Sequence, residues 1–221
     1  MSLEIKNRFF APLRLCAQYF STPRARNDYA THVPILIGLA RVREIKSVLE
    51  FGCGYYSTLT FLNRSVFPQL ERLQSVENDS SWGETLEEVA GKDDRWVLNL
   101  IQGDIADAVP GLDLETFDLI LIDDSTNSAQ RAATIRAVAN RQPRRPWIAI
   151  HDFEVEEYQR AARGFEKRYI FKSYNPQTGL VCNCTDFDSR SLNKLLKEKS
   201  KSLEPDDIPG WLRAFHSINP L

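Results

Sequence analysis

The sequence predicts an α/β protein with a doubly wound, mostly parallel sheet of seven strands and helices on both faces. Five short apolar runs alternate with longer segments that suit helices, a pattern typical of parallel βαβ units. The runs are mostly apolar throughout, as expected for strands buried on both faces. Two further β-rich runs are joined by a short turn-rich link, so they can pair only antiparallel. The 221 residues suit one domain with appendages.

The elements are expected in the following order. Residues 1–45 read as a helical N-terminal cap of the same domain, with Pro34 in the first turn of a helix over 33–42. Residues 46–185 form the core, and 186–221 a helical tail. The expected core strands are 47–51, 73–76, 97–102, 117–122 and 147–150. The expected helices are 59–67, 131–139 and 153–165, and the closing antiparallel pair is 167–174 and 180–184.

Composition and charge narrow the function classes. Lys and Arg number 28 against 30 Asp and Glu, a net charge of −2 that does not indicate a nucleic-acid or membrane partner. No apolar run approaches the roughly 20 residues needed to cross a bilayer, and the first residues are too charged for a signal peptide. We therefore expect a cytoplasmic protein. Its cysteines, expected as reduced thiols because they lack CxxC spacing, are Cys16, Cys53, Cys182 and Cys184.

Small or acidic polar residues follow each of the five apolar runs at once. In open parallel sheets, ligands bind outside the carboxyl ends of the strands, so these residues are expected to converge on one site. The alternative, for any one acid, is that it caps the helix that follows. The five endings are Glu50 to Gly54, Glu77 to Asp79, Gly103-Asp104, Asp123 to Ser125 and His151-Asp152.

The first ending is the most specific. Gly52 and Gly54 at a strand-to-helix turn let the backbone approach a ligand. A dinucleotide fingerprint needs a third glycine where Ser57 stands. An acid at Glu50 would repel a pyrophosphate and suits a cationic ligand instead.

This loop resembles the class I S-adenosylmethionine-dependent methyltransferases, and the resemblance runs from about residue 47 to 184. It is closest to small-molecule-type members whose first loop reads E-x-G-x-G-x-S-T-L, here with one extra residue before Ser57 and Thr58. The resemblance implies a Rossmann-like fold, S-adenosylmethionine as cofactor and S-adenosylhomocysteine as product.

The resemblance also implies the roles of the strand-end residues. The loop Gly52-Cys53-Gly54 would pass the methionine part of the cofactor, with Glu50 answering its ammonium. Glu77 would accept hydrogen bonds from both ribose hydroxyls. Asp104 would contact the adenine amino group, with Ile105 packing on the ring. The implied cofactor-binding set is Glu50, Gly52, Cys53, Gly54, Ser57, Thr58, Glu77, Asp104, Ile105 and Asp123.

Two departures restrict the reaction. The fourth strand lacks the Asn/Asp-Pro-Pro-Tyr ending, which argues against methylation of a nucleobase amino group. A related group of O-methyltransferases binds a divalent ion with two strand-end acids and a following Asn. Here Asp123 and Asp152 are present but Phe153 follows, so a divalent metal stays open and is not favoured.

Methyl transfer from a sulfonium chiefly needs alignment of the acceptor with the methyl carbon, and a hydroxyl acceptor also benefits from a base. His151 is the one histidine of three at a predicted strand end, so it is the first candidate base. Asp124 is the second, because Asp123 beside it can raise its pKa; its alternative is a helix N-cap. Candidate substrate contacts are Asp152, Arg131, which could instead pair with a nearby acid, and His32, on a segment expected to cover the substrate mouth.

The sequence therefore predicts methyl transfer to a small-molecule acceptor, with oxygen as the target atom. The alternatives are an NAD-dependent oxidoreductase and a non-catalytic module that keeps the cofactor pocket. A homodimer is left open, and the identity of the acceptor is not legible in the sequence.

Overall fold

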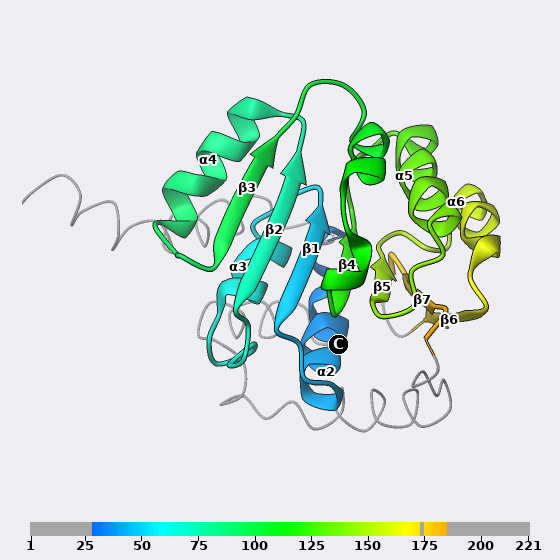
Figure 1. Cartoon of the computed structure of the whole chain (residues 1–221), viewed down its shortest axis with the longest axis horizontal. Coiled ribbons are helices and arrows are strands. Elements are labelled where there is room, and N and C mark those ends of the chain that lie inside the picture. The colour runs from blue at the N-terminus through cyan, green and yellow to red at the C-terminus, as the bar shows by residue number, and fades with distance from the viewer. Residues whose placement is uncertain (1–27, 173–174, 185–221) are drawn as a thin grey trace, which may run out of the picture.

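A seven-stranded sheet forms the centre of the molecule in the computed structural model, which describes residues 28–172 and 175–184 (Figure 1). The strand order is β3-β2-β1-β4-β5-β7-β6. Strands β1 to β5 are parallel, and β7 is antiparallel to both of its neighbours. The strands are β1 Ser47–Phe51, β2 Arg72–Glu77, β3 Trp96–Leu100, β4 Leu119–Ile122, β5 Trp147–Ile150, β6 Lys167–Phe171 and β7 Thr178–Cys182. The predicted doubly wound, mostly parallel sheet is confirmed.

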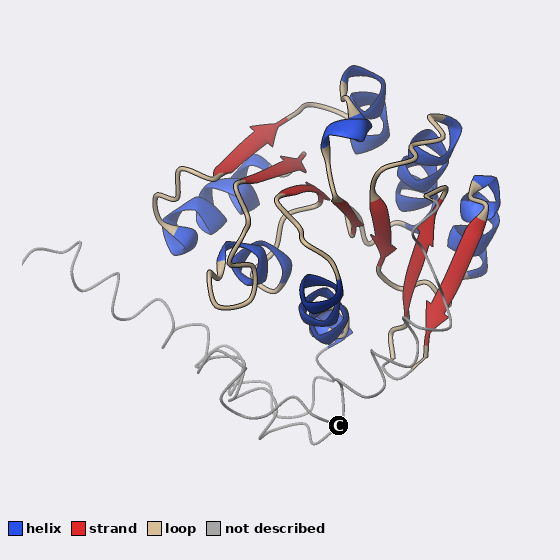
Figure 2. Ribbon diagram, turned by 60° about the horizontal axis from the view of Figure 1, so that its bottom comes forward, coloured by secondary structure: helices blue, strands red, loops and turns tan. Residues whose placement is uncertain are grey.

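Helices cover both faces of the sheet (Figure 2). One buried cluster joins the sheet to α2 and to residues of and after α3, and the other joins it to η2, α5 and α6. The expected location of Pro34 in the first turn of α2 is confirmed. The helices are η1 Asp28–Ala30, α2 Val33–Val42, α3 Ser57–Leu62, α4 Ser80–Ala90, η2 Ile105–Gly111, η3 Leu114–Thr116, α5 Ser128–Asn140, α6 Glu156–Ala161 and η4 Ala162–Gly164.

Several element boundaries differ from the prediction. Helix α3 ends at Leu62 instead of residue 67, because the Asn63 side chain accepts a hydrogen bond from Ser65 N at 2.9 Å and so offers the backbone a competing turn. Helix α6 begins only at Glu156, since Asp152 has a left-handed φ of 56°. The predictions for residues 1–27 and for the tail 186–221 lie outside the described residues.

The expectation of reduced thiols is wrong for two of the cysteines. Cys182 and Cys184 are joined in a disulfide, and both are buried. Cys53 is also buried, and its thiol is free. Within residues 28–172 and 175–184, no helix has the length and apolar character needed to span a membrane.

Strand register brings the polar strand ends together. Phe51 pairs with Ile122, and Ile122 pairs with Ile150, so the next residue of each strand leaves the sheet at the same edge. The ladder continues there, with Asp123 N donating to Phe51 O at 2.9 Å and His151 N to Ile122 O at 3.2 Å. Asp123 and His151 are therefore neighbours because of the parallel register.

Gly52 is required at this edge for a different reason from the predicted one. Its φ is +81°, and a Cβ there would overlap the backbone of Asp123 and Asp124. The glycine lets the chain after β1 approach the chain after β4. Gly54 has more room, since a Cβ there would meet only Ser57 Oγ at 3.5 Å.

Candidate active site

An aspartate and a histidine form the centre of the site. His151 Nδ1 lies 3.2 Å from each carboxylate oxygen of Asp123, and its Nε2 lies 2.9 Å from Thr31 Oγ1. Burial alone would lower the pKa of His151, but the charge and hydrogen bond of Asp123 outweigh it and the net change is upward. Burial would likewise raise the pKa of Asp123, yet His151 and Arg131 hold it at about 2. The pair therefore carries an ionised carboxylate beside an imidazole that holds its proton well.

Arg131 bridges two strand ends from within α5. Its Nη2 lies 2.8 Å from Asp123 Oδ1, and its Nη1 lies 2.6 Å from Asp152 Oδ2. The predicted pairing with an acid of the 123–124 loop is confirmed, but the pairing is buried, because Arg131 is only 4% exposed. Burial lowers the pKa of the guanidinium, and the carboxylates of Asp123 and Asp152 more than reverse this. Arg131 thus fixes the orientation of both acids.

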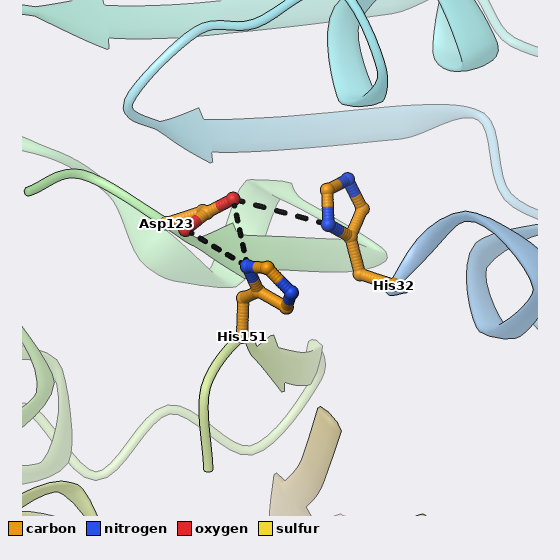
Figure 3. Close-up of side chains that lie close together, drawn as sticks. All are labelled: His32, Asp123 and His151. Carbon is orange, nitrogen blue, oxygen red and sulfur yellow. Dashed lines mark hydrogen bonds and ion pairs between the residues drawn. The ribbon is translucent and has the colours of Figure 1, made fainter. Parts of the chain in front are cut away.

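His32 joins this pair from the segment before α2 (Figure 3). Its ring packs edge-on against that of His151 with 4.7 Å between centroids, and its Nδ1 lies 3.9 Å from Asp123 Oδ2, too far for a hydrogen bond. The side chain is 1% exposed, and neither ring nitrogen has a hydrogen-bond partner among the described residues. Burial and then the charge of His151 lower its pKa to about 3, so the ring is neutral. His151 follows a strand, as predicted, and His32 reaches the same edge from the segment before α2.

Glu50 is enclosed by hydroxyl groups. Its Oε2 accepts hydrogen bonds from Thr58 Oγ1 at 2.7 Å and from Ser75 Oγ at 2.6 Å, and the residue has no exposed surface. Thr58 Oγ1 in turn accepts from Gly54 N at 3.1 Å. Burial raises the pKa of Glu50 to about 7, although the hydroxyls of Ser57, Ser75 and Thr58 lower it. Glu50 therefore holds the glycine loop in place through Thr58.

Glu77 ends β2 and is held by backbone amides. Its Oε1 accepts from Asn78 N at 2.8 Å and Asp79 N at 2.9 Å, and its Oε2 accepts from Cys53 N at 3.1 Å. The Cys53 thiol is a further, weak donor to Oε2 at 3.5 Å. A carboxylate has about four acceptor positions. This arrangement leaves room for one ribose hydroxyl at Oε2, and not for one on each oxygen.

The third strand end lies further along the same edge. Asp104 is exposed and its Oδ1 accepts a hydrogen bond from Gln130 Nε2 at 2.9 Å. Ile105 is buried in the core at the start of η2. Asn78 Nδ2 donates to Gly103 O at 2.9 Å, which ties the ends of β2 and β3 together.

Asp124 does not cap the following helix, because Asn127 is the N-cap of α5. Its Oδ2 instead accepts from Thr134 Oγ1 at 2.6 Å. Burial raises its pKa, so the predicted direction is confirmed, although burial and not Asp123 is the main cause. Asp124 thus keeps the properties of a candidate base.

Sequence reasoning missed three polar contacts of this edge. Thr31 carried no signal at all, because it lies in a segment without a motif. Ser75, a polar residue within an apolar strand, could have been found as a partner for Glu50. Trp82, whose Nε1 donates to Cys53 O at 2.7 Å and whose ring packs against Tyr55, fixes the glycine loop from α4.

A surface pocket lies away from this site. It is lined by residues 40–45 and 67–69, which precede β1 and β2, at the other end of the sheet.

Comparison with known proteins identifies the fold family. Residues 49–153 match the family described as "Methyltransferase domain", a span that holds the glycine loop and the strand ends of β2 to β5. This match covers slightly less than half of the chain, and it supports the class I S-adenosylmethionine-dependent methyltransferase that the sequence predicts. The sequence-based recognition of a methyltransferase is confirmed. A search of curated proteins gave no match.

Solved methyltransferase structures share the fold. Human methyltransferase-like protein 13, in complex with S-adenosylhomocysteine, is 18% identical with a TM-score of 0.55, over 79% of this chain and 92% of that one. The Podospora anserina methyltransferase PaMTH1, also bound to S-adenosylhomocysteine, is 17% identical with a TM-score of 0.54, over 67% and 76%. The O-methyltransferase TomG from Streptomyces achromogenes, bound to S-adenosylmethionine, is 18% identical with a TM-score of 0.51, over 68% and 78%. At these identities the likeness shows the fold of this methyltransferase, and not its acceptor.

Proposed function

We propose that this methyltransferase transfers the methyl group of S-adenosylmethionine to an oxygen of a small-molecule acceptor beside Asp123 and His151. One observation carries the proposal: His151 Nε2 already faces a hydroxyl, that of Thr31, at 2.9 Å. A base must lie about 2.6–3.2 Å from the oxygen whose proton it takes, so an acceptor hydroxyl in the place of Thr31 Oγ1 would have the required distance.

The reaction needs alignment and one proton acceptor. S-adenosylmethionine, when bound, would supply the methyl group: the acceptor oxygen would bond to the methyl carbon as the carbon–sulfur bond breaks, leaving S-adenosylhomocysteine. Holding the two reactants in line supplies most of the acceleration. The hydroxyl proton passes to His151, whose imidazolium is stabilised by Asp123. Asp124 is the second candidate base, because its raised pKa brings it nearer to the working range of a catalyst.

The cofactor is proposed to lie along the carboxyl ends of β1 to β4. The loop from Gly52 to Gly54 would face its methionine part, and Glu77 would accept a ribose hydroxyl through Oε2. Asp104, which is exposed, would be available to the adenine amino group. Asp152, whose side chain is 30% exposed, is the acid of the Arg131 bridge that a polar acceptor group can reach.

The test separates this proposal from its alternatives. The purified chain is incubated with S-adenosylmethionine and a panel of phenol, carboxylate, amine and thiol acceptors, and S-adenosylhomocysteine formation is followed. Turnover with hydroxyl or carboxylate acceptors, and not with amines, supports oxygen as the target. Cofactor binding without product from any acceptor would favour the non-catalytic module, and binding of NAD alone would favour an oxidoreductase.

A further inference from the structure

Three side chains from distant parts of the sequence place metal-binding atoms close together. His32 precedes α2, Asp123 follows β4 and His151 follows β5, and one ligand atom from each lies within 4.8 Å of the others. Figure 3 shows both imidazoles directed toward the carboxylate of Asp123. His32 Nδ1 lies 3.9 Å and His151 Nδ1 3.2 Å from the same oxygen, Asp123 Oδ2.

His32 is buried without a hydrogen-bond partner for its side chain among the described residues. Both of its nitrogens are buried and lack hydrogen-bond partners within the described part of the chain. Leaving a buried polar group unsatisfied costs about 1–3 kcal/mol, and an apolar ring would avoid that cost. Nδ1 of His32 faces Asp123 at 3.9 Å, too far for a hydrogen bond, so this nitrogen can offer the lone pair that a metal ion requires.

We propose that His32, Asp123 and His151 bind one divalent transition-metal ion, through Nδ1 of each imidazole and Oδ2 of the carboxylate. Two nitrogens and one oxygen suit Zn²⁺, Co²⁺ or Fe²⁺, whereas Mg²⁺ and Ca²⁺ are bound through oxygen ligands. Around a tetrahedral ion with bonds of about 2.0–2.1 Å, neighbouring ligand atoms lie about 3.3 Å apart. The observed 3.2 and 3.9 Å are close to that spacing.

The groups behind the ligands support the same assignment. Ligating histidines usually donate their other N–H to a nearby acceptor, and ligating carboxylates are themselves hydrogen-bonded. His151 Nε2 faces Thr31 Oγ1 at 2.9 Å, and Asp123 Oδ1, the oxygen not assigned to the ion, is bound by Arg131 Nη2 at 2.8 Å. The two outer contacts leave His151 Nδ1 and Asp123 Oδ2 for the ion.

This set differs from the pair of strand-end acids that the sequence suggested. Asp152 is bound to Arg131 at 2.6 Å and is not a member of the three-residue cluster. Its replacement in the set is His32, which no strand-end motif could have indicated.

The metal site rests on the proposed function in one respect, which is that the open coordination position of the ion would face the methyl acceptor. Three protein ligands leave a coordination position open, as in catalytic zinc sites. An acceptor hydroxyl bound there would lose its proton more readily, because a metal ion lowers the pKa of a bound oxygen. In the metal-bound protein, His151 would be a metal ligand and not the base. The ion would activate the acceptor hydroxyl in its place, and the hydroxyl proton would pass to solvent.

The test is metal binding by the full chain, measured independently of turnover. Protein freed of metal with a chelator is titrated with Zn²⁺, Co²⁺ and Mg²⁺ by calorimetry, and the visible absorption of bound Co²⁺ is recorded. His32→Phe removes both nitrogens and keeps an aromatic ring of similar size. Glu84→Gln is the control, because it changes an exposed acid on α4 that is not a member of the cluster.

We expect one Zn²⁺ or Co²⁺ per chain and no comparable Mg²⁺ binding. His32→Phe should weaken Zn²⁺ binding at least about tenfold, the lower end of what even outer contacts contribute, and Glu84→Gln should not. The melting temperature of the wild type should rise with Zn²⁺ and that of His32→Phe should not. A cooperative melting transition of His32→Phe also shows that the variant is folded. Wild-type protein that binds no Zn²⁺ or Co²⁺, or His32→Phe that binds them as the wild type does, would overturn the proposal.

Binding of S-adenosylhomocysteine is measured on the same samples. Cofactor binding without metal binding would remove the metal site and leave the proposed methyl transfer intact. Metal binding without cofactor binding would contradict the proposed methyl transfer and leave the metal site intact.

Discussion

Replacing Glu50 by glutamine should change how the stability of the protein depends on pH. The carboxyl is fully buried, and burial raises its pKa from an ordinary 4.5 to about 7. Because the folded state binds this proton more tightly than the unfolded state, the contribution of Glu50 is fully present below pH 4.5. It is lost as the pH rises through about 7.

The size of the effect follows from the two pKa values. A difference of one pKa unit corresponds to about 1.4 kcal/mol, so the full loss between these pKa values is on the order of 3 kcal/mol. Glutamine is uncharged and has nearly the shape of the protonated acid, and its amide oxygen can accept from Thr58 and Ser75 as Oε2 does. Relative to the wild type, Glu50→Gln should therefore gain stability as the pH rises from 5 to 8.

Urea unfolding of both proteins at pH 5, 6, 7 and 8 measures this difference. Asp123 and the histidines also titrate, but they do so in both proteins and largely cancel in the comparison. Glu84→Gln is the matched control, since Glu84 is exposed on α4 and its replacement should leave the wild-type curve unchanged. Wild-type and Glu50→Gln stabilities that run parallel over this range would refute the reasoning.

Four further substitutions test individual contacts. Glu77→Ala should weaken S-adenosylhomocysteine binding by about 1.5–3 kcal/mol, the usual value of a hydrogen bond to a charged group; calorimetry on the folded variant showing wild-type affinity would count against its contact with the ribose. His151→Gln should abolish turnover while cofactor binding stays near the wild type, and the wild-type rate should fall at acid pH as His151, whose pKa is raised, gains its proton. If the rate survives in His151→Gln and disappears in Asp124→Asn, Asp124 is the base. His32→Phe should be more stable than metal-free wild type by about 1–3 kcal/mol in urea unfolding, because it removes two buried unpartnered nitrogens; a large loss of stability would show that His32 has a partner in solution.

The fold was predictable because its strands are short, apolar and regularly spaced. Strands β1 and β5 have the predicted bounds. Strand β7 begins at Thr178, two residues before the predicted start. The prediction assigned these two residues to the turn, because a glycine soon after Asn175 and Pro176 favours a turn over a strand. A side chain at Gly179 would overlap the ring of Phe153, so the glycine serves packing between strand and loop, which a single sequence does not reveal.

The site was predictable where it depends on strand ends and not where it depends on tertiary contacts. Asp123, His151 and Arg131 meet as expected, because parallel strands place their ends at one edge. His32 and Thr31 reach that edge from the N-terminal segment, and no local pattern specifies how such a segment packs. The Cys182–Cys184 disulfide was missed because the lack of CxxC spacing argued for reduced thiols.

Calorimetric titration of the full chain with S-adenosylhomocysteine, and with NAD in parallel, tests the central claim most directly. We predict that S-adenosylhomocysteine binds at one site per chain, that Glu77→Ala weakens it, and that NAD gives no heat of binding. Binding of NAD with no binding of S-adenosylhomocysteine would contradict the assignment of cofactor and reaction.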